Sequence, residues 1–164
     1  MKEIILKLSE LKSGKNRFSV SSTAQELDLE NIEFPIVDDI KTDVEVYKNR
    51  NNFEIRLKTR FTFHLTCSRC LSEFDEEYAD TSTFYIKKGE IPEIPEGMIH
   101  EEHIQTLYVS GDEYDIAPLI REQVILSIPI KPLCSETCTV PSYDSGMDEV
   151  DSRWSELLKL KEKL

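Results

Sequence analysis

The chain has 164 residues, a hydrophobic fraction of 39% and a net charge of −12, from 20 Lys and Arg against 32 Asp and Glu. This length predicts a single domain over residues 1–164, with a core of modest size. The hydrophobic fraction excludes a wholly disordered acidic chain, and the apolar runs are far shorter than the roughly 20 residues of a membrane helix. The excess of acid excludes a protein that coats nucleic acid through bulk positive charge, because Lys and Arg drive phosphate binding.

The first 17 residues differ from the rest of the chain, since they hold five Lys or Arg and two Glu, a local charge of 5 − 2 = +3. Glu3 and Lys7 flank or interrupt the apolar run at residues 4–6, where a signal peptide would need an unbroken apolar stretch. We therefore expect a cytoplasmic protein with no membrane partner. Any RNA contact has to be local, and this arm is one of the few basic surfaces.

Alternation of apolar and polar residues at positions 4–8 predicts a first strand, and Ser13-Gly14-Lys15-Asn16 predicts a turn. A second short strand is expected at 17–21. Residues 24–39 show only a weak pattern, and Phe34-Pro35 favours extended chain, so we interpret this stretch as a covering segment.

A β-hairpin is the clearest element: residues 43–48 alternate, residues 49–52 have turn chemistry, and residues 53–66 alternate without a break. One face of the second strand is apolar. Its other face places Arg56, Lys58 and Arg60 in a row, with His64 beyond them. These four residues are our candidates for binding RNA or another partner. Alternatively, the charges only solvate the sheet and pair with Asp43 and Glu45, or with Glu76 and Asp80.

Further along the chain, residues 74–87 predict another strand, and residues 88–104 predict an acidic surface loop that includes the solvated His100-Glu101-Glu102-His103. Apolar spacing over 116–127 predicts an amphipathic helix with Asp115 as its N-cap. A C-terminal helix is expected at 151–163. The predicted fold is α+β: an antiparallel, curved sheet or partial β-barrel with one packed amphipathic helix and the C-terminal helix.

Four cysteines form two close pairs, Cys67 with Cys70 and Cys134 with Cys138, separated by 63 residues. Two short loops that each supply two thiolates are typical of a structural zinc site, so zinc is the expected cofactor and these four are the candidate ligands. Unligated cysteines and redox chemistry are the alternatives. A redox motif would need a helix that begins at the first cysteine, and the acidic residues 75–77 are expected to raise the thiol pKa.

The ordered motifs of the chain resemble the bacterial YceD family, whose members are described as large ribosomal RNA subunit accumulation proteins. The motifs are Cys67-x-x-Cys70-Leu71, the segments around Asp115-Ile116 and Pro129, the second cysteine pair, and a closing Arg153-Trp154. The resemblance covers most of the chain from about residue 43. One departure is that Thr139-Val140-Pro141 follows Cys138, where family members often have a glycine.

The resemblance implies a non-enzymatic factor that supports 23S ribosomal RNA accumulation or processing and assembly of the large ribosomal subunit. Its partner would be 23S rRNA or a large-subunit ribosomal protein, and neither DNA nor a membrane. Two other hypotheses stay open: a thiol-disulfide oxidoreductase that uses Cys67 and Cys70, and a zinc-stapled adaptor protein unrelated to ribosomes.

Overall fold

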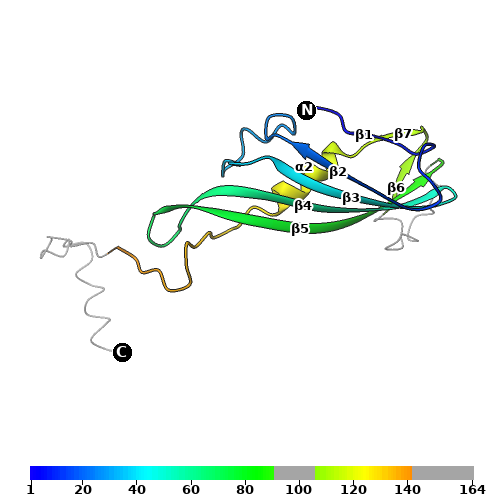
Figure 1. Cartoon of the computed structure of the whole chain (residues 1–164). Coiled ribbons are helices and arrows are strands. Elements are labelled where there is room, and N and C mark those ends of the chain that lie inside the picture. Colours follow the sequence, from blue (N-terminus) through cyan, green and yellow to red (C-terminus); the bar gives the residue numbers. More distant parts are fainter. Residues whose placement is uncertain (91–105, 142–164) are drawn as a thin grey trace, which may run out of the picture.

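The computed structural model describes residues 1–90 and 106–141. It contains seven strands and one helix in this part of the chain (Figure 1). The elements in chain order are β1 (Ile5–Lys7), β2 (Gly14–Ser22), β3 (Ile40–Asn49), β4 (Asn52–Thr66), β5 (Glu73–Lys88), β6 (Thr106–Val109), β7 (Glu113–Asp115) and α2 (Ala117–Leu126).

Strands β2 to β6 form one sheet in the order β2-β3-β4-β5-β6. The pairs from β2 to β5 are antiparallel, as predicted, but β5 and β6 are parallel, so the prediction of a purely antiparallel sheet is wrong. A parallel neighbour requires a connection of about a dozen or more residues. Positions 89–105 provide 105 − 89 + 1 = 17 residues between these two strands.

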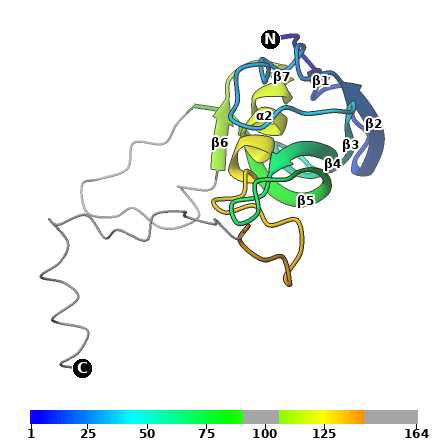
Figure 2. The same cartoon turned by 90° about the vertical axis from the view of Figure 1, so that its left-hand side faces the viewer.

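The sheet curves around α2, and the short antiparallel pair of β1 and β7 lies on the opposite side of the helix (Figure 2). The predicted curved sheet and packed helix are therefore confirmed. The two sheets remain separate, so the alternative of a partial barrel is not what forms. We call the face of the large sheet that contacts α2 the inner face and the opposite one the outer face.

The predicted hairpin is confirmed, with Arg50 and Asn51 between β3 and β4. Arg50 has a φ of +54°, the left-handed backbone that tight hairpin turns require. The inner face of β4 carries the apolar residues that the alternation predicts. They are all nearly or fully buried: Phe53, Ile55, Leu57, Phe61, Phe63 and Leu65.

One polar residue, Thr59, interrupts this apolar face of β4 and is fully buried. Its hydroxyl donates to Gln123 Oε1 on α2 at 2.8 Å and lies 3.1 Å from the Thr42 hydroxyl on β3. Gln123 Nε2 donates to Asp80 Oδ2 on β5 at 2.8 Å. This network joins three strands to the helix, and every buried polar group in it has a partner.

Helix α2 spans Ala117–Leu126, one residue shorter at each end than the predicted helix. Ile116, not Asp115, occupies the N-cap position. The Asp115 carboxylate nevertheless accepts hydrogen bonds from the backbone N–H groups of Ala117 at 2.9 Å and Ile4 at 2.8 Å. Asp115 therefore joins the N-terminal segment to the start of the helix. The described residues contain no helix long and apolar enough to cross a membrane.

The covering segment at residues 24–39 is confirmed, because its Leu27 and Leu29 are buried in the core and Ile36 bridges to Phe63. The acidic loop at 88–104, apart from its first three residues, and the C-terminal helix at 151–163 lie outside the described residues.

Candidate functional site

The first cysteine loop, residues 67–72, follows directly after the long strand β4. Within it, the Cys67 carbonyl accepts from the Leu71 N–H at 3.0 Å, and the Ser72 carbonyl accepts from the Cys67 N–H at 2.8 Å. Leu71 has a φ of +63°, which reverses the chain into β5. The loop thus turns Cys67 and Cys70 toward the same point.

The second cysteine loop, residues 132–138, comes after α2 and lies beside the first (Figure 1). The Pro132 carbonyl accepts from the Ser68 N–H at 2.9 Å. The Arg69 guanidinium donates to the Cys138 carbonyl at 2.6 Å and to the Glu136 carbonyl at 3.1 Å. These contacts hold the two loops together. Residues 139–141 have no left-handed backbone, so this loop does not need the glycine that many relatives carry there.

The four sulfur atoms form one cluster, with every candidate ligand atom within 4.8 Å of the others. Cys67 Sγ lies 3.6 Å from Cys138 Sγ, and Cys70 Sγ lies 3.5 Å from Cys134 Sγ. A metal ion with tetrahedral bonds of about 2.3 Å to sulfur would separate its ligands by about 3.8 Å. The predicted four cysteines are therefore brought together and could bind a metal ion.

The surroundings of the cluster make Cys67 the most acidic thiol. Backbone N–H groups, first that of Cys70 and then that of Cys134, lower the pKa of Cys67 to about 5. The Ser72 hydroxyl lowers the pKa of Cys70, whereas burial raises the pKa of Cys138 to about 11. The prediction that residues 75–77 raise the thiol pKa is wrong for Cys67 and Cys70, because nearby hydrogen-bond donors outweigh the more distant carboxylates.

The other candidate residues, Arg56, Lys58, Arg60 and His64, lie along the outer face of β4. Arg60 pairs with Asp43 at 3.1 Å, and Arg56 approaches Glu54 at 3.4 Å. His64 Nδ1 donates to Asp75 at 2.6 Å, and this hydrogen bond raises the pKa of His64. Among the described residues, Lys58 has no ion-pair partner. Acids therefore compensate most of this cationic strip, and His64 belongs to a separate acidic end of the sheet.

The predicted acidic partners of the strip are only partly right. Glu45 pairs with Lys15 at 2.9 Å and with Arg17 at 2.6 Å. Asp80 is in register with Thr59, and Glu76 is in register with Phe63, so both lie on the inner face and cannot pair with the strip. The period-2 rule, applied across the register, would have excluded these two residues.

The structure also shows candidates that the reading of separate strands missed. Lys15 and Arg17 of the N-terminal arm lie on β2, and the register places Arg17 in one cross-strand row with Glu45 and Arg56. The basic arm and the cationic strip are thus one surface. On the same face, Tyr47 and Tyr85 flank Glu54, a feature that the alternation of each strand could have indicated.

These observations define a sheet-and-helix domain in which a four-cysteine cluster joins the β4–β5 turn to the segment after α2. The family model of the large ribosomal RNA subunit accumulation protein YceD matches residues 55–161, and the chain belongs to this family. The match includes both cysteine pairs and begins at residue 55, later than the resemblance from about residue 43. No curated protein and no solved structure matches the chain.

Proposed function

We propose that this protein is a non-enzymatic factor that supports accumulation of the large-subunit ribosomal RNA and, through it, assembly of the large ribosomal subunit. The observation that carries the proposal is the family match over residues 55–161. The chain would act in the cytoplasm, where subunits are assembled, with 23S rRNA or a large-subunit ribosomal protein as its partner. The outer face of the sheet, with β2 and the cationic strip on one surface, is the candidate contact.

We also infer that the metal of the four-cysteine cluster is a structural zinc ion. Four thiolates and sulfur separations of 3.5 and 3.6 Å suit tetrahedral coordination, and a site with four protein ligands has no open position for catalysis. When bound, zinc would supply only a crosslink. Cys67 and Cys70 would hold it from the end of β4, and Cys134 and Cys138 from the segment after α2.

A thiol-disulfide oxidoreductase is the second candidate function, and the lowered pKa of Cys67 is the observation in its favour. Two features count against it. The side chain of Cys67 is fully buried, whereas a reactive thiolate needs access to its substrate. In addition, the first cysteine loop leads into the strand β5 and not into a helix.

Depletion of the protein, followed by gradient sedimentation of ribosomal subunits and measurement of 23S precursors, tests the proposal. We expect fewer large subunits and more precursor, with normal small subunits. Normal large-subunit levels would refute it and would favour an adaptor unrelated to ribosomes. Complementation with Cys67→Ser and a disulfide-exchange assay of the purified protein address the redox alternative, which requires measurable exchange.

A further inference from the structure

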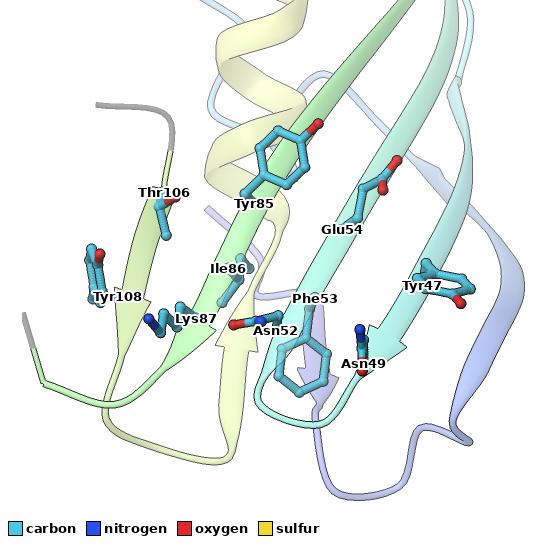
Figure 3. Close-up of a pocket in the computed structure, with 10 residues that line it drawn as sticks. All are labelled: Tyr47, Asn49, Asn52, Phe53, Glu54, Tyr85, Ile86, Lys87, Thr106 and Tyr108. Atoms are coloured by element: carbon cyan, nitrogen blue, oxygen red, sulfur yellow. The ribbon is translucent and has the colours of Figure 1, made fainter. Parts of the chain in front are cut away.

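Two exposed tyrosines lie in one cross-strand row on the outer face. The register aligns Lys15 on β2 with Tyr47 on β3, Glu54 on β4, Tyr85 on β5 and Thr106 on β6. Tyr47 is 54% exposed and Tyr85 is 44% exposed, although large aromatic side chains usually gain from burial. We call Tyr47, Glu54 and Tyr85 the tyrosine row, and Figure 3 shows them in this order on neighbouring strands.

The tyrosine row lines an open hollow of about 640 Å³ at the end of the sheet near the β3–β4 turn. Its remaining lining is mostly polar and includes the side-chain amides of Asn49 and Asn52 and the phenol of Tyr108 on β6 (Figure 3). Flat aromatic rings beside amide groups offer both a stacking surface and hydrogen-bond partners. Such a combination suits a planar, polar ligand group.

Positive charge gathers beside this hollow, in a protein whose net charge is −12. Three adjoining hollows on the outer face are lined by five cations, Lys15, Arg17, Arg56, Lys58 and Lys87, and three acids, Asp43, Glu45 and Glu54. Their sum is 5 − 3 = +2. The charge of this surface therefore complements an anion, which a bulk count of the sequence conceals.

We propose that the tyrosine row binds a short single-stranded RNA segment, with unpaired bases stacked on Tyr47 and Tyr85. This inference rests on the proposed function and names its contact surface. Strands are spaced by about 4.8 Å, so the two rings stand about 10 Å apart, far enough to stack separate bases. Glu54 between them can accept hydrogen bonds from base amino groups and repels phosphates, which favours a backbone that runs along Lys15, Arg17 and Arg56.

Single-stranded RNA fits this surface better than duplex RNA or a protein. A duplex hides the faces of its bases, so it cannot use the rings. The centre of a stable protein interface is depleted of charge, whereas the tyrosine row has Glu54 in its middle and cations on its border. The rings, the amides and the cations together match the way proteins bind unpaired nucleotides.

Binding of a fluorescent, unstructured RNA of about 12 nucleotides tests the inference. We expect the double variant Tyr47→Ala, Tyr85→Ala to bind about tenfold to a hundredfold more weakly, and Tyr47→Phe, Tyr85→Phe to bind within about twofold of the wild type, because phenylalanine keeps the ring. Thr62→Ala, at the far end of the same face of β4, is the matched control and should not change binding. Thermal unfolding verifies that each variant is folded.

Several results would overturn the inference. They are equal binding by the alanine and phenylalanine variants, binding of the corresponding duplex at least as tightly as the single strand, and binding only to large-subunit ribosomal proteins. Complementation separates this inference from the proposed function. If the alanine variant fully restores large subunits in depleted cells, the tyrosine row is not the contact but the function stands; if depletion leaves large subunits normal, the function itself is wrong.

Discussion

Cys70 Sγ lies 3.5 Å from Cys134 Sγ, although 64 positions separate the two residues in the sequence. Together with Cys67 and Cys138 they form a cluster that ties the β4–β5 turn to the chain beyond α2. Because the sulfurs are too far apart for S–S bonds of about 2.05 Å, the four cysteines are free to act as ligands. A bound metal would therefore restrain the second cysteine loop against the sheet.

The protein purified without chelator should contain about one zinc per chain, because four thiolates complete a tetrahedral site. Cys134→Ser should reduce this to below about 0.2 zinc per chain, and it alters an exposed residue outside the core. Elemental analysis measures both. Ser135→Ala, in the same loop but without a ligand, should keep the metal. Less than about 0.2 zinc in the wild type would refute zinc binding.

Replacement of Gln123 by Leu should lower the free energy of unfolding by about 1 to 3 kcal/mol. The change leaves the buried Thr59 hydroxyl without the acceptor that it contacts at 2.8 Å. In the double variant with Thr59→Val, no hydroxyl remains unpaired at Thr59. The double variant should therefore lose less than the sum of the two single variants. Urea unfolding of all four proteins measures the coupling, and strict additivity would show that this hydrogen bond contributes nothing.

Replacement of Leu71 by Gly should raise the free energy of unfolding by about 1 kcal/mol, because the φ of +63° is strained for leucine and free for glycine. The leucine side chain is 65% exposed, so its removal sacrifices little burial. Val140 is equally exposed but has no left-handed backbone, and Val140→Gly should give no gain. Thermal unfolding compares the two, and destabilisation by Leu71→Gly would contradict the expectation.

The pair of His64 and Asp75 should make stability depend on pH. The hydrogen bond to Asp75 raises the pKa of His64, so its stabilising effect is fully present below the unfolded pKa of about 6.5 and is lost as the pH rises through the folded pKa. The difference in urea midpoint between wild type and His64→Gln should thus be larger at about pH 6 than at about pH 8.5. Asp75→Asn should remove most of it. A difference that does not vary with pH would refute this role.

Local patterns in the sequence predict much of this fold. The alternation over residues 53–66 predicts β4 and its buried face, and the spacing of Ile116, Leu119 and Ile120 predicts α2 to within one residue at each end. The spacing of the cysteines predicts the four-cysteine cluster. Each of these signals depends on neighbours a few residues apart, whose side chains share one face of one element.

The register between strands decides what the sequence could not. The separation of β1 from the large sheet, the parallel addition of β6 and the inward position of Asp80 all depend on which residues oppose each other across strands. A period of two assigns a residue to one of two faces but does not say which residue of another strand lies beside it. For that reason, only the tertiary structure aligns Lys15, Tyr47, Glu54 and Tyr85 in one row, and only it shows a positive surface on an acidic protein.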